Sequence, residues 1–496
     1  MKHLKKIVSL LLTAVMVLAM CIPVMADAAT ATTCAIKAPA TNHVYKIYQI
    51  FTGDLKENVL SNIKWGANGK GTQGGIVDET ILNKLAAVNS KSDREILDVV
   101  EEYADLNKTQ VSSITNGQTY DAVPGYYLIK DDETVEGIDS YTTYIVKVVG
   151  NVDISPKTGA PSFEKKVQDT NDTTGETSVW QDSADYDIGD LVPFRLEGTV
   201  ASNYGDYKTY YFAFHDVEEK GLTFKKDSVE VYIDGTKITS GYDVITNTTD
   251  GCTFEVVFNN LKEINTVDVN GGSKITVEYK SELNDEAVLG SNGNVNEAKL
   301  EFSNNPNSNQ VGKPDKPGET PWDNVIVFTY QVVVNKYANS VSDGNKLTGA
   351  EFTLSKKLKD NTTKDIAVVK STDGTSFTFK GLDDGDYILT ETKTPDKYNT
   401  IDPITFTVTA EHKITWETDD RTDILTKLNG NAASGKITFT ATKNDGKLET
   451  DVINKSGSSL PETGGIGTTI FYVVGVILML GAGVLLVTKK RMSSNR

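Results

Sequence analysis

Short runs of β-branched and aromatic residues dominate the middle of the chain and constrain its fold most strongly. Between Ser162 and Asn309, runs of Val, Ile, Thr, Tyr and Phe are separated by clusters of Gly, Asp and Asn, a pattern typical of a β-sandwich. Residues 324–455 have the same character. Residues 229–233, followed by Asp234 and Gly235, predict a β-hairpin. We therefore expect two tandem β-sandwiches, at residues 162–309 and 324–455.

The region before these sandwiches, residues 29–155, has a mixed pattern. Strand-like segments at 42–53 and 141–149 flank residues 79–104, where apolar side chains recur at helical spacing. We expect an α+β domain, or a mostly β domain with a helical insert. No residues in it suggest a chemical reaction. The chain as a whole is predicted to be mostly β.

Two proline-containing segments are expected to connect the three regions. Residues 156–161 place Lys157 between Pro156 and Pro161, and residues 310–323 hold three prolines without apolar periodicity. Both compositions favour extended, solvated linkers. Lys157 should therefore be exposed, protonated and accessible to a large partner.

The N-terminus has the pattern of a secretory signal peptide. A basic start is followed by an apolar stretch at 7–24 and by Ala26, Asp27 and Ala28, and this order is typical of signal sequences with an A-x-A-like cleavage site. Residues 1–28 are expected to be removed on export. The exported chain would begin near residue 29.

The C-terminal region, residues 456–496, combines three features in a fixed order. An uncharged run at 465–488 is followed by a basic cluster at 489–491 and preceded by a pentapeptide: Leu460, Pro461, Glu462, Thr463 and Gly464. As a helix, residues 466–487 would span roughly 33 Å, enough for a hydrocarbon core of about 30 Å. The basic cluster favours the cytoplasmic side. An ordinary membrane anchor after a chance pentapeptide would not explain all three features.

Composition excludes several functions. The formal net charge is −18 and the pI about 4.8, which argues against a nucleic-acid partner. Only Cys34 and Cys252 remain after export, so a disulfide framework is not expected. Four histidines and two cysteines show no metal-ligand spacing, and no catalytic signature appears. We expect no metal, cofactor or enzyme activity.

The acidic loop 169–175 does not match a calcium-loop spacing and is expected to be a solvated hairpin tip.

Strand parity places three polar residues on an apolar face in each predicted sandwich, because alternate residues of a strand face the same side. In the first sandwich Lys165 shares a face with Phe163 and Val167, and the same reasoning selects Asp216 and Asn296. The corresponding residues of the second sandwich are Lys336, Glu391 and Asn454. Charged side chains are rarely buried unless paired. Two matching triads therefore indicate a shared purpose.

These features together resemble a pilin of a sortase-assembled Gram-positive pilus. The C-terminal region resembles a cell-wall sorting signal, in which a sortase cuts between Thr463 and Gly464 and joins the threonine carbonyl to an amine. The resemblance implies immunoglobulin-like domains cross-linked by Lys–Asn isopeptide bonds, with a nearby Asp or Glu promoting the reaction. Residues 29–155 would then be the N-terminal pilin domain, without a triad of this kind.

The two sandwiches resemble two different types of isopeptide domain. Residues 162–309 are similar to the CnaA type, in which an N-x-A segment matches Asn296, Glu297 and Ala298. Residues 324–455 are similar to the CnaB type, and residues 387–398 match its YxLxExxxPxGY pattern, except that Lys397 replaces the glycine. The resemblance implies bonds from Lys165 to Asn296 and from Lys336 to Asn454, promoted by Asp216 and Glu391.

The physical chemistry of burial supports this reaction. Burial lowers the pKa of a lysine, so that a neutral nucleophilic amine forms, and raises the pKa of a carboxyl group, which can then donate a hydrogen bond to the carboxamide. Rigid strands supply the effective molarity, and ammonia leaves once per domain. The reaction is a self-modification without turnover. In the alternative interpretation, each lysine reaches solvent and each asparagine caps a turn.

The resemblance also implies how subunits join. The acceptor lysine of a pilin lies between the first and second domains, commonly after proline, which selects Lys157; residues 152–155 follow the usual VxVYPK pattern only loosely. Lys165, Lys166 and Lys313 remain alternatives. The implied partners are a pilus sortase, a housekeeping sortase, identical subunits and peptidoglycan, whereas no motif indicates a host surface ligand.

The leading interpretation is the shaft subunit of a cell-wall-anchored pilus. A monomeric wall-anchored adhesin and a basal minor pilin use the same domains and remain alternatives. A wall-anchored enzyme is the least favoured interpretation, because no catalytic group was found.

Overall fold

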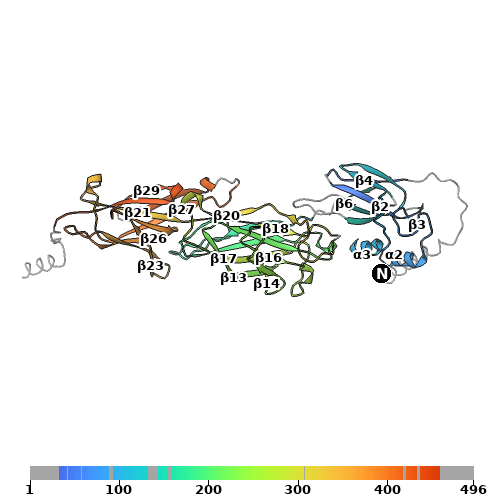
Figure 1. Cartoon of the computed structure of the whole chain (residues 1–496), viewed down its shortest axis with the longest axis horizontal. Helices are drawn as coiled ribbons and strands as arrows, with labels where there is room; N and C mark the ends of the chain where they lie inside the picture. The colour runs from blue at the N-terminus through green and yellow to red at the C-terminus, as the bar shows by residue number, and fades with distance from the viewer. Residues whose placement is uncertain are drawn as a thin grey trace, which may run out of the picture.

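The computed structural model describes ten stretches of the chain: residues 33–41, 43–56, 59–88, 93–131, 143–148, 150–154, 159–306, 308–416, 421–432 and 436–457. Within them the fold is mostly β, as predicted, and three domains follow one another along an extended molecule (Figure 1). The signal peptide, Lys157, the pentapeptide at 460–464 and the apolar run at 466–487 lie outside the described residues. None of the described helices has the length and apolar character needed to cross a membrane.

The first domain combines sheets and helices. Its larger sheet consists of β2 (Val44–Lys56), β3 (Val59–Trp65), β4 (Ser112–Thr115), β6 (Gly125–Asp131) and β7 (Thr143–Val148). Its smaller sheet consists of β1 (Cys34–Lys37), β5 (Thr119–Ala122) and β8 (Val152–Asp153). The predicted helical segment forms α2 (Glu79–Val88) and α3 (Asp93–Glu101). Leu97 and Val100 of α3 share a buried cluster with Phe51 and Leu128 of the larger sheet.

The second domain is a β-sandwich. One sheet consists of β9 (Phe163–Val167), β11 (Leu191–Thr199), β13 (Leu222–Ile233), β14 (Thr236–Ile238) and β17 (Lys274–Leu283). The other consists of β10 (Ser183–Asp185), β12 (Phe212–Glu218), β15 (Asp243–Ile245), β16 (Phe254–Phe258), β18 (Asn294–Phe302), β19 (Gly318–Glu319) and β20 (Asp323–Phe328). Inward side chains of the two sheets form one core. The predicted hairpin is confirmed: Asp234 and Gly235, both at positive φ, connect β13 to β14.

Strand β20 belongs to the second sandwich, although its residues were expected to begin the third domain at 324. It pairs antiparallel with β18 and parallel with β10. Strand β19, within the expected linker 310–323, also pairs with β18. A short apolar strand fits either neighbouring sheet, so its sequence does not reveal which sheet it joins.

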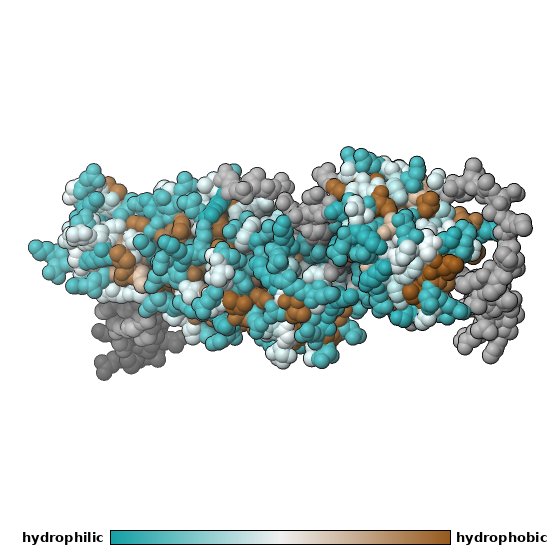
Figure 2. Space-filling view, turned by 45° about the vertical axis from the view of Figure 1, so that its right-hand side comes forward, coloured by the Kyte–Doolittle hydropathy of each residue, from teal (hydrophilic) through white to brown (hydrophobic). Residues whose placement is uncertain are grey.

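The third domain is a second sandwich. One sheet consists of β21 (Tyr330–Ala338), β24 (Val368–Lys370), β25 (Ser376–Leu382), β29 (Phe439–Thr442) and β30 (Lys447–Asn454). The other consists of β22 (Glu351–Lys357), β23 (Thr363–Ile366), β26 (Gly385–Lys393), β27 (Ile404–His412) and β28 (Leu425–Ala432). The first strand, β21, pairs in parallel with the last, β30, and this register places Ala338 opposite Asn454. The visible surface of the molecule is largely hydrophilic (Figure 2), in keeping with the net charge of −18.

Candidate functional site: buried lysine, acid and asparagine triads

The three predicted residues of the second domain meet in its core. Lys165 on β9, Asp216 on β12 and Asn296 on β18 each have 0% exposure. The Lys165 ammonium donates a hydrogen bond to Asp216 Oδ2 and another, of 2.9 Å, to the Tyr279 hydroxyl. That hydroxyl donates to Asp216 Oδ2 at 2.7 Å and accepts from Asn296 Nδ2 at 2.9 Å. One tyrosine oxygen therefore joins the whole triad.

Tyr279 was not predicted from the sequence, although a signal for it exists. It alternates with Ile275 and Val277 along β17, so parity directs it into the core. A buried tyrosine hydroxyl requires a polar partner, and the partners of this one are Lys165, Asp216 and Asn296. The rings of Tyr279 and Phe194 also lie 5.5 and 5.6 Å from Lys165 Nζ, which keeps the amine in apolar surroundings.

The three predicted residues of the third domain also meet. Lys336 Nζ lies 3.3 Å from Glu391 Oε1. Asn454 Nδ2 donates to Glu391 Oε2 at 2.9 Å and to the carbonyl oxygen of Asn399 at 2.6 Å. All three triad side chains are buried. The parallel pairing of β21 with β30 explains why residues so distant in sequence share one site.

Burial changes the protonation of these groups in the direction that amide formation needs. In the second domain, burial lowers the pKa of Lys165 more strongly than the Asp216 charge raises it, and burial raises the pKa of Asp216. In the third domain, burial lowers the pKa of Lys336 despite the neighbouring Glu391. A neutral amine is the nucleophilic form of lysine. Each site therefore presents its lysine close to both an acid and a carboxamide.

The carboxamide oxygens are left without partners. Within the described part of the chain, Asn296 Oδ1, Asn454 Oδ1 and Asp216 Oδ1 are buried and make no hydrogen bond. A buried unsatisfied polar atom costs about 1–3 kcal/mol. A protonated Asp216 would satisfy one such oxygen by donating a hydrogen bond to the carboxamide, which would also polarise its carbonyl carbon.

The alternatives to Lys157 as an acceptor differ in accessibility. Lys165 is fully buried and committed to the triad. Lys166 pairs with Asp182 at 2.6 Å and Glu164 at 2.8 Å, and Lys313 pairs with Glu301 at 2.7 Å. Both remain partly exposed. Lys165 can therefore be removed from the set of acceptor candidates.

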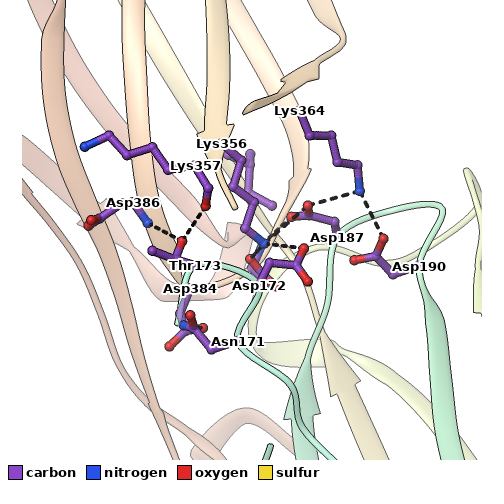
Figure 3. A network of polar contacts seen from close by, with 12 residues as sticks. Asn171, Asp172, Thr173, Asp187, Asp190, Lys356, Lys357, Lys364, Asp384 and Asp386 are labelled. Atoms are coloured by element: carbon purple, nitrogen blue, oxygen red, sulfur yellow. Dashed lines mark hydrogen bonds and ion pairs between the residues drawn. The ribbon is translucent and has the colours of Figure 1, made fainter. Parts of the chain in front are cut away.

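The acidic loop at 169–175 packs against the third domain, so the expectation of a solvated hairpin tip was wrong. Asn171 Nδ2 donates to Asp384 Oδ1 at 2.7 Å. Thr173 Oγ1 donates to the carbonyl oxygen of Lys357 at 2.8 Å and accepts from the backbone N–H of Asp386 at 3.0 Å (Figure 3). A polar loop can be solvated by water or by a neighbouring domain, and its sequence does not distinguish the two.

A third buried lysine lies at this domain interface and has the opposite electrostatics. Lys356 Nζ lies 3.1 Å from Asp172 Oδ2 and 3.3 Å from Asp187 Oδ2, and it also pairs with Asp383 (Figure 3). Burial alone would lower the pKa of Lys356, but the surrounding carboxylates outweigh burial and raise that pKa. Lys356 is therefore a fixed ammonium that holds two domains together, whereas Lys165 and Lys336 are candidate nucleophiles.

Comparison with known proteins agrees with this architecture. Residues 331–422 match the SpaA family, described as a prealbumin-like fold domain, and residues 453–494 match the LPXTG cell wall anchor motif. The chain is therefore a cell-wall-anchored surface protein built from β-sandwich modules.

Its relatives include the trypsin-resistant surface T6 protein of Streptococcus pyogenes serotype M6, which is 27% identical over 441 residues, covering 77% of this chain and 78% of the relative. The solved structure of the T6 backbone pilin of Streptococcus pyogenes has the same fold, with a TM-score of 0.51 and 20% identity over 88% of this chain and 100% of that one. The full-length major pilin SpaD of Corynebacterium diphtheriae also matches, with a TM-score of 0.48 and 17% identity over 88% of this chain and 99% of that one.

Proposed function

We propose that the protein is the shaft subunit of a covalent surface pilus. The observation that carries the proposal is the presence of two complete Lys–acid–Asn triads in consecutive domains, each buried and each bringing the first strand of its sandwich to a strand far along the chain, β18 in the second domain and β30 in the third. The wall anchor motif and the similarity to a protein whose structure is described as a backbone pilin add support. A shaft subunit must carry tension, and cross-links between strands that are far apart in the sequence suit that task.

In each domain the lysine and asparagine form an isopeptide bond. The neutral Nζ of Lys165 or Lys336 attacks the side-chain carbonyl carbon of Asn296 or Asn454. The Nζ–Cγ bond forms, the bond from Cγ to the carboxamide nitrogen breaks, and that nitrogen leaves as ammonia after taking up the amine proton. Asp216 or Glu391 holds the carboxamide oxygen and relays the proton. No oxidant, metal or cofactor takes part in this step.

Subunits are joined by a second kind of amide bond. A pilus sortase cleaves between Thr463 and Gly464 and transfers the threonine carbonyl to Lys157 of the next subunit. A housekeeping sortase transfers the last subunit to peptidoglycan. Lys157 follows directly after the first domain, whose last strand ends at Asp153, and precedes β9. The position between two folded domains would leave a lysine accessible to an enzyme.

The test is a denaturing gel of wall extracts from cells that express the protein. A shaft subunit gives a ladder of high-mass polymers, and Lys157→Ala abolishes the ladder while monomer stays attached to the wall. Lys166→Ala is the matched control and should preserve the ladder, because Lys166 is engaged with Asp182 and Glu164. A single monomer band from the unaltered protein would contradict the shaft function and favour a monomeric adhesin.

A further inference from the structure

A histidine of the second domain is buried outside the triads. His215 lies on β12 next to Asp216, and its side chain points to the opposite face of the sheet, where it has 0% exposure. The turn between β15 and β16 covers it with Asp250 and Cys252. The proposed cross-linking chemistry uses none of these side chains.

Three potential metal-binding atoms, His215 Nδ1, Asp250 Oδ2 and Cys252 Sγ, converge on one side of the His215 ring. Nδ1 lies 2.9 Å from Asp250 Oδ2, 3.8 Å from Cys252 Sγ and 3.6 Å from Glu255 Oε1. Cys252 Sγ lies 3.3 Å from Asp250 Oδ2. Zinc bonds of about 2.0–2.3 Å in a tetrahedron place N, O and S donors roughly 3.3–3.6 Å apart. The three separations among His215 Nδ1, Asp250 Oδ2 and Cys252 Sγ, which are 2.9, 3.3 and 3.8 Å, are within about half an ångström of that arrangement.

The other side of the same ring provides a second, independent observation. His215 Nε2 lies 3.2 Å from Glu301 Oε2, and Lys313 Nζ lies 2.7 Å from the same oxygen; both are ion-pair contacts without hydrogen-bond geometry. A histidine that binds a metal usually donates its other ring N–H to a carboxylate, which orients the ring. A neutral imidazole has one N–H, so with its proton on Nε2 the lone pair of Nδ1 faces the Asp250 carboxylate. In that tautomer two acceptors face each other and a cation between them would satisfy both, whereas a proton on Nδ1 would make Nδ1 the donor to Asp250.

We propose that His215 Nδ1, Asp250 Oδ2 and Cys252 Sγ bind a zinc ion. A set of nitrogen, sulfur and oxygen donors selects zinc over calcium or magnesium, which prefer oxygen alone. The Asp250 side chain is 33% exposed, so an ion can enter from solvent. Binding replaces the thiol proton of Cys252, which is released to water.

The bound ion would attach the β15–β16 turn to the middle of β12, directly beside Asp216. It would thereby stiffen the strand that carries the acid of the triad. The sequence spacing does not predict this site. His215 and Cys252 are far apart in the chain, and the pairing of β12 with β16 brings them together.

The experiment measures zinc binding to the metal-free mature protein by calorimetry and cobalt binding by absorption. We expect one zinc ion per chain and, with cobalt, a charge-transfer band from the thiolate. Cys252→Ser and Asp250→Asn should each abolish stoichiometric binding, and both are tested for folding by circular dichroism. Cys34→Ser, which removes the buried cysteine of the first domain, is the matched control and should bind zinc normally.

Glu301→Gln tests the orientation of the ring and should weaken zinc binding about 10–100-fold without changing the stoichiometry. The absence of stoichiometric zinc binding to the folded protein would overturn the proposal. Binding that survives both Cys252→Ser and Asp250→Asn would also overturn it, because the ion would then occupy another place.

Discussion

Lys356 Nζ of the third domain lies 3.3 Å from Asp187 Oδ2 of the second, and both side chains are buried. Each domain thus holds part of the counter-charge that the other needs. A buried lysine without carboxylates, or buried carboxylates without a lysine, is costly. The two sandwiches are therefore expected to behave as one rigid unit, and this can be tested directly.

Replacing Lys356 should weaken that unit. Lys356→Met keeps the apolar stem but leaves Asp172, Asp187 and Asp383 without their shared cation. Breaking a buried ion pair by removing one partner costs about 3–5 kcal/mol, and the partial exposure of Asp172 favours the lower end. Thermal unfolding should therefore begin at a lower temperature. Lys357→Met, at the neighbouring position directed away from the cluster, is the control (Figure 3), and equal melting of the two variants would contradict the role of Lys356.

The two isopeptide bonds predict a specific mass. The mature folded protein should weigh two ammonia molecules less than its sequence requires. Asp216→Ala and Glu391→Ala should each have lost only one ammonia molecule relative to the mass calculated from its sequence, because each variant lacks the acid of one triad. Asp227→Ala, which alters an exposed residue of the second domain, is the control and should leave both losses in place. Intact-mass spectrometry decides, and an unshifted mass for the unaltered protein would exclude both bonds.

Tyr279 should affect the rate of cross-linking in the second domain alone. Tyr279→Phe preserves the ring that packs on Phe194 and Phe254 but removes the hydroxyl that holds Lys165 and Asn296. Loss of positioning slows such reactions by up to about 100-fold. Freshly made Tyr279→Phe protein should therefore have lost only one ammonia molecule, and its mass should fall by the second ammonia only slowly. Tyr232→Phe on β13 is the control and should have the same mass as the unaltered chain. Bond formation at the normal rate would assign Tyr279 a packing role only.

The interface loop predicts a pH effect on stability. Burial, assisted by the charge of Asp384, raises the pKa of Asp169 from 3.8 to about 7. The folded state therefore binds more protons than the unfolded state between about pH 4 and 7, and this group's contribution to stability is lost as pH rises through that window. In Asp169→Asn, stability should fall less steeply as pH rises from about 4 to 7, since the amide mimics the protonated acid and does not titrate.

The measurement is the difference in melting temperature between Asp169→Asn and the unaltered chain at each pH. The difference is used because it cancels the effect of His412, which both proteins share. Burial lowers the pKa of His412 to about 4, so His412 makes the folded state more stable as pH rises from about 4 to 6.5, opposite to Asp169. Asp227→Asn, at an exposed position, serves as the control. A constant difference across the window would exclude Asp169 as the titrating group.

Sequence patterns predicted the triads well because strand parity is a local and strict rule. Lys165, Asp216 and Asn296 needed only their immediate neighbours to be assigned to the core, and so did Lys336, Glu391 and Asn454. Contacts that depend on how distant segments meet could not be predicted. The docking of loop 169–175 and the convergence of His215 with Cys252 arise from domain contact and sheet pairing, which local patterns do not encode. For Tyr279, parity indicates the burial of the side chain but not the position of its hydroxyl beside the triad.

Strand β20 has a mechanical consequence once both bonds are formed. A pull applied between Lys157 and Thr463 passes from β9 through one cross-link to β18, and later from β21 through the other to β30. The chain segments between Lys165 and Asn296 and between Lys336 and Asn454 are bypassed by the cross-links and bear no load. The load-bearing backbone between the two cross-links is the stretch from Asn296 to Lys336, which contains β20. This strand is hydrogen-bonded to β18 and β10, and its side chains at 325–328 are buried in the cores of both sandwiches. Under tension this stretch alone would carry the full load inside the two sandwiches, so any extension of the cross-linked pair would have to begin there, against the burial of β20 in both cores.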